Sequence, residues 1–171
     1  AFCFLVTDVV EHDKLWQRFF AGAKSKTYNI ISHVANKTNT PNWINQAAIE
    51  TIETGWGEES LVWAWVNMIR EGMKNPSNQY FALVSGTCLP IKNYEKLYEG
   101  ITSEPRSQIH IDRTAIRPKD YLYADQWHIL NRQHAQLLID FVDTQEGKDY
   151  MNVMRSDLEG FASDELYPVN W

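Results

Sequence analysis

Short apolar runs and amphipathic stretches alternate along most of the chain. The runs from Phe2 to Thr7 and from Tyr80 to Val84 are almost continuously apolar, which is typical of strands buried on both faces of a parallel sheet. The segments from Tyr28 to His33 and from Ala48 to Thr54 contain the apolar and β-branched residues of two more strands. The first half of the chain therefore predicts four strands.

Helical spacing of apolar residues separates these runs. A helix is predicted from Asp13, which can cap it, to Gly22, which ends it. A second helix follows the Gly55-Trp56-Gly57 turn and carries a wide apolar face from Glu58 to Met73. A short helix is predicted from Tyr94 to Glu99, so strand and helix recur in turn.

The last part of the chain has a different pattern. The stretch from Gly100 to Tyr123 is polar and irregular, and it predicts a long loop. An apolar face that includes Trp127 and Leu130 predicts a helix from Asp125 to Val142. A short helix from Gln145 to Met154 and an acidic closing loop are expected to follow.

This order of elements predicts an α/β fold with a mostly parallel sheet and helices on both faces. A chain of 171 residues has room for one such domain, and we expect residues 1–171 to form it. Ligands of open α/β sheets bind outside the carboxyl ends of the strands. The segments expected at that edge are Thr7-Asp8, His33, Trp56-Gly57 and Ser85 to Cys88.

Charge and the length of the apolar runs exclude two classes of function. Sixteen basic against 22 acidic residues give a formal charge of −6, the wrong sign for a protein that binds a nucleic-acid backbone. No apolar stretch approaches the roughly 18 residues that a membrane-spanning helix requires. Cys3 and Cys88 allow at most one disulfide, and we interpret both as buried thiols in a reducing compartment.

The chain lacks the common motifs for phosphate loops, dinucleotides and catalytic metals. Neither G-x-x-x-x-G-K-[ST] nor G-x-G-x-x-G occurs, and H-E-x-x-H, C-x-x-C and Asp-x-Asp are also missing. His110 and Asp112 could supply two metal ligands, but no third is located, and a solvated loop explains them as well. Ser85, His33 and Asp8 could form a nucleophilic triad, but no G-x-S-x-G surrounds the serine.

The segment from Phe81 to Lys92, FALVSGTCLPIK, resembles the F-x-L-L-S-x-S-C-I-P-L segment of the core-2/I-branching glycosyltransferases. These enzymes are relatives of the β-1,6-N-acetylglucosaminyltransferases and of peptide O-xylosyltransferase. The resemblance runs from about Phe2 to Tyr167, with four further segments in the same order. They are Leu15-Trp16 to Phe20 with Ser32-His33-Val34, Trp56-Gly57 with Ser60-Leu61-Val62, Gln126-Trp127 with Leu130 and Arg132, and Ser163-Asp164-Glu165 with Tyr167.

The resemblance implies a GT-A-like fold, a UDP-sugar donor and inversion at the anomeric carbon, with no divalent metal and no other cofactor. An inverting transfer needs one carboxylate that removes the proton of the attacking acceptor hydroxyl, and the resemblance assigns this role to Glu165. The like charge of the adjacent Asp164 is compatible with a base that holds a proton well. A helix cap or a surface loop is the alternative interpretation of this acidic pair.

The resemblance also implies contacts for the two substrates. Small side chains and short loops at the strand ends would surround the donor, and an indole would offer a flat platform for a sugar ring. The implied donor contacts are Val6, Thr7, His33, Trp56, Gly57, Ser85, Gly86, Thr87 and Cys88. The implied acceptor contacts are Lys92, Gln126, Trp127 and Asp164, of which the first three could also touch the donor sugar. As simpler alternatives, His33 could be a buried structural histidine and Trp127 a core aromatic.

Two features depart from the family pattern. The family places the cations that neutralise the leaving diphosphate after the acidic motif, whereas no basic residue follows Glu165 here. Either the chain is truncated at its C-terminus, or residues that once intervened are missing, or basic residues of the long loop substitute. The candidates in that loop are Arg106, Arg113, Arg117 and Lys119.

The second departure is the small number of cysteines. Secretory-pathway members are disulfide-linked and membrane-anchored, so this chain fits a compact cytoplasmic form of viral or bacterial type better. If it is a fragment of a membrane-anchored enzyme, the Golgi lumen is expected instead.

The sequence therefore predicts a metal-independent transferase that moves xylose or N-acetylglucosamine from UDP to a glycan hydroxyl in β linkage, with a slight preference for xylose. One alternative is a non-catalytic module whose tryptophans and tyrosines bind glycans. Another is a glycoside hydrolase, which would need a second carboxylate several ångströms from Glu165.

Overall fold

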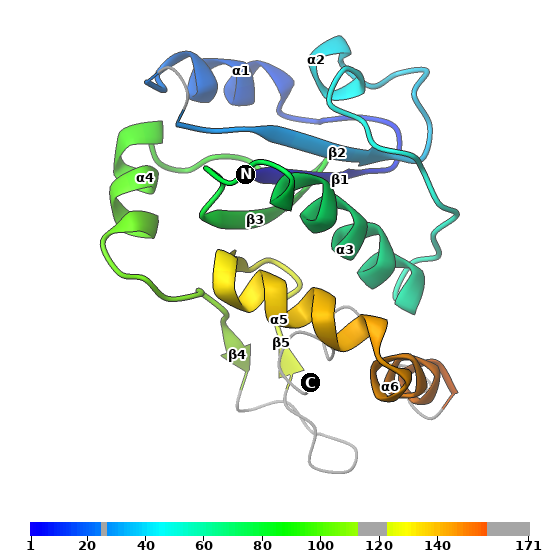
Figure 1. Ribbon diagram of the computed structural model, residues 1–171. Coiled ribbons are helices and arrows are strands. Elements are labelled where there is room, and N and C mark those ends of the chain that lie inside the picture. Colours follow the sequence, from blue (N-terminus) through cyan, green and yellow to red (C-terminus); the bar gives the residue numbers. More distant parts are fainter. Residues whose placement is uncertain (25–26, 113–122, 157–171) are drawn as a thin grey trace.

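The structure is a computed structural model that describes residues 1–24, 27–112 and 123–156 (Figure 1). At its centre is a four-stranded sheet in the order β2-β1-β3-β6. Both β2 and β3 run parallel to β1, whereas β6 runs antiparallel to β3, which confirms the expected mostly parallel sheet. The strands are β1 (Phe2–Val6), β2 (Ile30–Val34), β3 (Tyr80–Ser85) and β6 (Ile129–Asn131).

Strand β1 is buried on both faces, which explains why its sequence is continuously apolar. Phe2, Phe4 and Val6 point into one hydrophobic core, and Cys3 points into the other. The two cores are covered by different helices, so every residue of this strand has apolar partners on its own side.

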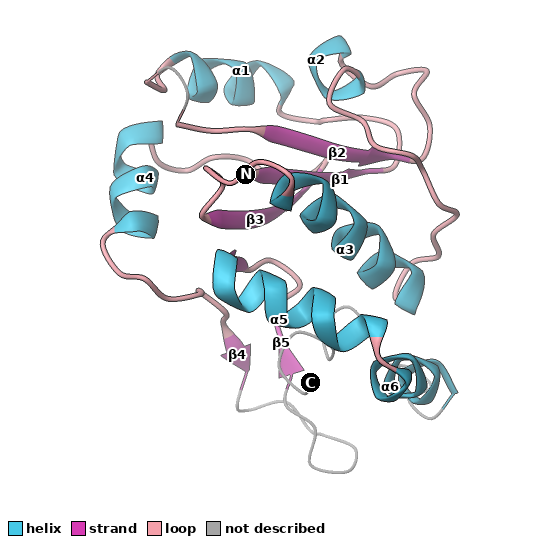
Figure 2. Cartoon of the chain, in the orientation of Figure 1, coloured by secondary structure: helices cyan, strands magenta, loops and turns pink. Residues whose placement is uncertain are grey.

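Helices cover both faces of the sheet, as predicted (Figure 2). The first face carries α1 (Asp13–Ala21), the one-turn α2 (Asn42–Asn45) and α4 (Tyr94–Thr102). The opposite face carries α3 (Glu59–Met73), α5 (Arg132–Asp143) and α6 (Gln145–Ser156).

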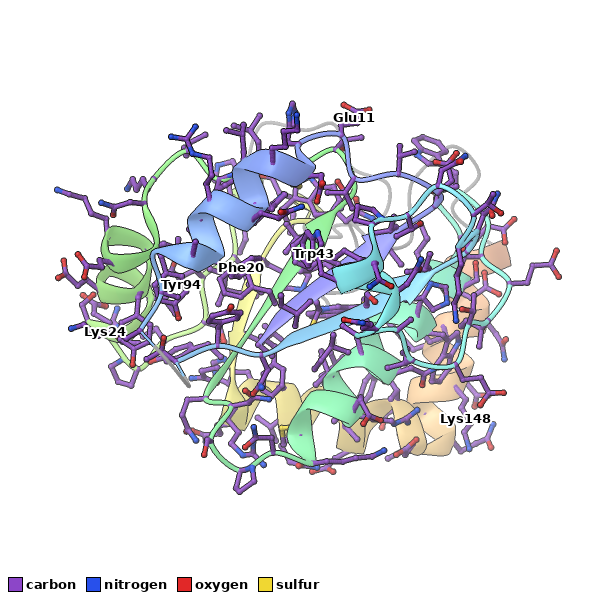
Figure 3. The ribbon with its side chains drawn as sticks, turned by 90° about the horizontal axis from the view of Figure 1, so that it is seen from above. Glu11, Phe20, Lys24, Trp43, Tyr94 and Lys148 are labelled. Carbon is purple, nitrogen blue, oxygen red and sulfur yellow. The ribbon has the colours of Figure 1, made fainter. Side chains whose placement is uncertain are left out.

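Aromatic rings fill the core beneath α1. Phe4 packs edge-on against Trp16 with 5.0 Å between ring centroids, and Phe20 stacks on Tyr28 at 4.7 Å. Trp43 of α2 closes this cluster beside Phe20 (Figure 3). Its indole N–H donates to the Asp13 carboxylate over 2.6 Å. Such edge-on and offset ring pairs contribute about 1 kcal/mol each beyond the area they bury.

The segment from Ala48 to Thr54 is not a strand, so that prediction was wrong. Ala48 makes a single bridge to Ser32, and the chain beyond it is held to β2 mainly by side chains. The Thr51 hydroxyl donates to the Val34 carbonyl over 2.9 Å, and the Ile52 N–H donates to His33 Nε2 over 3.0 Å. These bonds hold the segment against β2 without a continuous ladder of backbone hydrogen bonds.

The predicted helix from Asp125 is also wrong over its first turns. Residues 129–131 form β6, and Leu130 pairs with Phe81 of β3 as part of the core. The helix begins only at Arg132, where the Asn131 side chain accepts a hydrogen bond from the His134 N–H over 2.8 Å. Pairing with the remote strand β3 outweighed the local helical spacing.

A small two-stranded sheet also lies within the segment predicted to be irregular. It consists of β4 (Ile111–Asp112) and β5 (Tyr123–Ala124), which pair antiparallel. Both cysteines are free thiols. Cys3 is buried as predicted, whereas Cys88 is only half-buried.

Candidate functional site

The carboxyl ends of three neighbouring strands form the candidate site. The register aligns Val6 of β1 with Val34 of β2, and Leu5 with Ser85 of β3. The loops that leave these strands therefore start side by side, as the sequence predicted for Thr7, His33 and the residues after Ser85.

Backbone hydrogen bonds tie these loops to one another. The Thr7 carbonyl accepts from the Asn36 N–H over 2.6 Å, and the Gly86 carbonyl accepts from the Glu11 N–H over 2.8 Å. The Thr40 hydroxyl donates to the Asp8 carbonyl over 2.8 Å. The loop after β1 is thus held on both sides, and the exposed Thr7 side chain sits on a fixed backbone.

Several hydrogen bonds hold the turn from Ser85 to Cys88. The Ser85 hydroxyl lies 2.9 Å from the Thr87 hydroxyl and accepts from the Thr87 N–H over 3.2 Å. The Ser85 N–H donates to Cys88 Sγ, and the Cys88 carbonyl accepts from the indole N–H of Trp16 over 2.9 Å. This arrangement exposes Thr87 and half-exposes Ser85, so two small hydroxyl side chains face the strand edge.

Gly86 is required by close packing in this turn. A Cβ at this position would overlap the carbonyl oxygen of Val9, because the loop after β1 lies directly against it. The glycine therefore allows two strand-end loops to meet.

His33 is a buried residue within β2. Its relative exposure is 1%, Nε2 accepts the Ile52 N–H, and Nδ1 has no hydrogen-bond partner. Burial lowers the pKa of His33, and the bond from Ile52 opposes this shift only partly. The neutral ring holds the 47–52 segment against the sheet, and its proposed donor contact remains a prediction.

The Trp56-Gly57 turn is present as predicted, immediately before α3. Gly57 has a φ of 74°, which glycine adopts without strain, and the Ser60 hydroxyl accepts the Gly55 N–H over 2.9 Å. The Trp56 side chain is 94% exposed. Its indole is therefore open to a ligand, although it lines none of the cavities described below.

Trp127 lies beside the end of β3. The Leu83 N–H donates to the His128 carbonyl over 3.1 Å, which places Trp127 next to Val84 and near the Ser85 turn. Trp127 and Val84 line the same cavity of about 590 Å³, and the Trp127 side chain is 41% exposed. Gln126 precedes it in the loop between β5 and β6 and is half-buried.

His128 also lines this cavity, but its ring packs against α3. Its ring packs edge-on against Trp65 at 4.2 Å, and neither ring nitrogen has a hydrogen-bond partner. Burial lowers the pKa of His128 to about 4, although the backbone of Gln126 and Asp125 opposes the shift. The side chain is therefore a neutral part of the core at physiological pH.

The remaining predicted contacts are dispersed. Lys92 lies in the segment between the Ser85 turn and α4, and it lines a groove of about 440 Å³ together with Arg18 and Gly22 at the C-terminal end of α1. Arg106 is exposed, with its Nε 3.4 Å from a carboxylate oxygen of Glu104. Several predicted residues lie outside the described part of the chain: Arg113, Arg117, Lys119, Asp164 and Glu165.

No group of three or more potential metal ligands occurs among residues 1–24, 27–112 and 123–156. His110 instead pairs with Asp125, with 2.8 Å between Nδ1 and the carboxylate oxygen. This pair was missed by sequence reasoning because the two residues are brought together by the β4–β5 pairing. In the same part of the chain, no helix is long and apolar enough to cross a bilayer.

The mostly parallel sheet and its two helical layers define an α/β protein of the GT-A-like type. The chain belongs to the Core-2/I-branching enzyme family, whose model matches residues 1–167. It is similar to the glycosyltransferase BC10 of rice (Oryza sativa subsp. japonica), with 26% identity over 159 residues. The match covers 82% of this chain and 40% of the length of the rice protein.

Proposed function

We propose that this protein is an inverting, metal-independent glycosyltransferase that moves xylose or N-acetylglucosamine from a UDP-sugar to a glycan hydroxyl in β linkage. Family membership supports a transferase, and the rice relative is a glycosyltransferase. The observation that carries the proposal is the turn from Ser85 to Cys88, with its hydroxyls at the strand edge and its glycine against the Val9 carbonyl.

The donor lies across the ends of β1 and β3 in this proposal. The hydroxyls of Ser85 and Thr87 are placed to bond oxygens of the ribose or the phosphates, and Gly86 lets the donor approach the backbone. Thr7 contributes from the neighbouring loop. The Ser85 turn contains no carboxylate, so these residues hold the donor without a bridging metal.

The chemical step is a single displacement. The oxygen of the acceptor hydroxyl forms a bond to the anomeric carbon while the bond from that carbon to the β-phosphate oxygen of UDP breaks. Glu165 takes the hydroxyl proton as the new bond forms. The charge that develops on the diphosphate is balanced by Arg106 together with Arg113, Arg117 or Lys119 of the same loop.

The test is the substitution Glu165→Gln, with Glu146→Gln of α6 as the matched control. Loss of the general base should lower kcat by about 10² to 10⁴-fold, whereas the Kd for UDP should change less than about twofold. Release of UDP from UDP-xylose and UDP-N-acetylglucosamine measures the first quantity, and titration calorimetry measures the second. Retained turnover in Glu165→Gln contradicts this base, and a wild-type protein that does not bind UDP favours the glycan-binding module.

A further inference from the structure

A second feature of the strand edge is the cavity of about 590 Å³ beside Trp127. Its walls are largely apolar and come from β1, α1, β3, α4 and β6, whereas its polar side chains lie on the segment before β4. The volume is in the range of ligand sites, and so is the combination of apolar walls with a few polar groups. The residues that line this cavity include Phe2, Trp16, Val84, Leu97, Gln108 and His110.

The polar side of the cavity is held by backbone pairing. Gln108 and Ile129 exchange two backbone hydrogen bonds of 2.7 and 2.9 Å, and the Asp125 N–H donates to the His110 carbonyl over 3.0 Å. Trp127 lies between these two points, in the loop that joins β5 to β6. The loop that carries the indole is therefore tied at both ends to the segment that carries the imidazole.

The partner of His110 determines what its imidazole can do. The Asp125 carboxylate accepts the Nδ1 proton over 2.8 Å, so the neutral ring carries its free lone pair on Nε2. Among the described residues, Nε2 has no hydrogen-bond partner, and the His110 side chain is 73% exposed. An acceptor atom is thus presented to solvent at the same cavity as a partly open indole.

We propose that Trp127 and the His110–Asp125 pair form one subsite that holds a sugar ring of the acceptor glycan. The indole takes the C–H face of the pyranose, and Nε2 of His110 accepts a hydrogen bond from a ring hydroxyl. The subsite rests on the proposed function, because only a transferase has an acceptor to present. It lies next to the Ser85 turn, so the acceptor ring would sit beside the donor. His110 determines specificity here and takes no proton in the chemical step.

The experiment measures acceptor and donor binding separately. Methyl β-glycosides of galactose, xylose and N-acetylglucosamine are titrated into the full chain in the presence of UDP, and binding is followed by saturation-transfer NMR. The variants are His110→Ala, His110→Gln, Trp127→Phe and Trp127→Ala. The matched control is Gln136→Ala, which breaks another exposed side-chain bond, from Gln136 to Asp140 on α5.

His110→Ala should weaken binding of the glycoside that the wild type binds by about tenfold, the value of one hydrogen bond. His110→Gln should recover part of this loss, because its amide oxygen can accept the same bond. Trp127→Phe should retain more binding than Trp127→Ala. The Kd for UDP should stay within about twofold in all variants, and in transfer assays the loss should appear in the acceptor KM and not in kcat.

Each outcome has a distinct meaning. Equal glycoside binding by the wild type, His110→Ala and Gln136→Ala overturns the subsite, and so does a wild type that binds UDP but none of the three glycosides. A wild type that binds a glycoside in a His110-dependent manner but transfers no sugar keeps the subsite and contradicts the proposed transferase. Thermal unfolding of each variant separates a lost contact from a lost fold.

Discussion

Gly86 has no room for a side chain, because the Val9 carbonyl occupies the space where a Cβ would lie. The constraint comes from packing between two loops, since its backbone is not in the left-handed region. His128 shows another single-residue constraint. Its ring is buried against Trp65 without a hydrogen-bond partner, so the protein retains a polar group where an apolar ring would fit.

The substitution Gly86→Ala should lower the free energy of unfolding by roughly 2 kcal/mol, because the Val9 loop must shift to admit the methyl group. It should also weaken UDP binding, since the Ser85 turn moves with it. Gly100→Ala is the control. Gly100 lies within α4 with nothing near its Cβ position, so this change should stabilise the protein by about 0.5–1 kcal/mol. Denaturant unfolding with and without UDP measures both effects, and equal stability of the two variants would contradict the packing argument.

Stability should fall in acid because of His128. Above pH 6.5 the ring is neutral in both the folded and the unfolded state, and it makes no contribution to the pH dependence. Between pH 6.5 and the folded pKa of about 4, only the unfolded chain takes up the proton, so the free energy of unfolding decreases by roughly 3 kcal/mol. His33, whose pKa burial also lowers, adds to the same trend.

The substitution His128→Phe should remove most of this loss and keep the edge-on contact with Trp65. The exposed His134→Phe serves as the control for the replacement of a histidine by phenylalanine. Denaturant unfolding at pH 7.5, 6, 5 and 4.5 measures the effect. An unchanged slope in His128→Phe would show that other groups cause the acid sensitivity.

At the scale of elements, Arg132 joins two helices across the end of the sheet. Its guanidinium donates to the backbone carbonyls of Met73, Asn75 and Asn78, at distances of 2.9 to 3.1 Å. Some of these carbonyls belong to the open C-terminal end of α3, which has no further helical partners. One residue at the start of α5 therefore fixes both the end of α3 and the turn that leads into β3.

Replacement of Arg132 by Met keeps much of the side-chain volume and removes these three charge-assisted bonds. The free energy of unfolding should fall by roughly 2 kcal/mol. Gln133→Met, at the neighbouring exposed position, should change it by less than about 0.5 kcal/mol. The midpoint of urea unfolding gives both values, and hydrogen exchange should show faster exchange at the end of α3 in the Arg132 variant alone.

At the scale of the whole molecule, the candidate site is assembled from segments far apart in the sequence. The loop after β1, the end of β2, the Ser85 turn and the segment before β6 meet at one edge because β1 and β3 are adjacent in the sheet. In the proposed mechanism, arginine and lysine side chains neutralise the leaving diphosphate at this edge.

Treatment with EDTA should therefore leave the transfer rate within about twofold of the untreated rate. A chelator removes a divalent ion but does not affect guanidinium or ammonium groups. The rate of UDP release with and without added Mn²⁺ measures this. Loss of activity that Mn²⁺ restores would contradict the cation substitution, and the Glu165→Gln variant provides the background rate.

Local patterns of residues determined much of this protein. Strands β1 and β3 and helices α1 and α3 follow from their own periodicity, because each apolar face is encoded within the element. The position of the Ser85 turn at the strand edge follows from the rule for parallel sheets. Glu165 and Asp164, outside the described residues, remain predictions.

Only the tertiary structure decided the elements that depend on a remote partner. Leu130 belongs to a strand because Phe81 lies opposite it, and the segment after Ala48 lacks a ladder because its bonds go to side chains and carbonyls of β2. His110 meets Asp125 through the pairing of β4 with β5. Strand pairing and burial are non-local, so neither the spacing of apolar residues nor their composition specifies which segments meet.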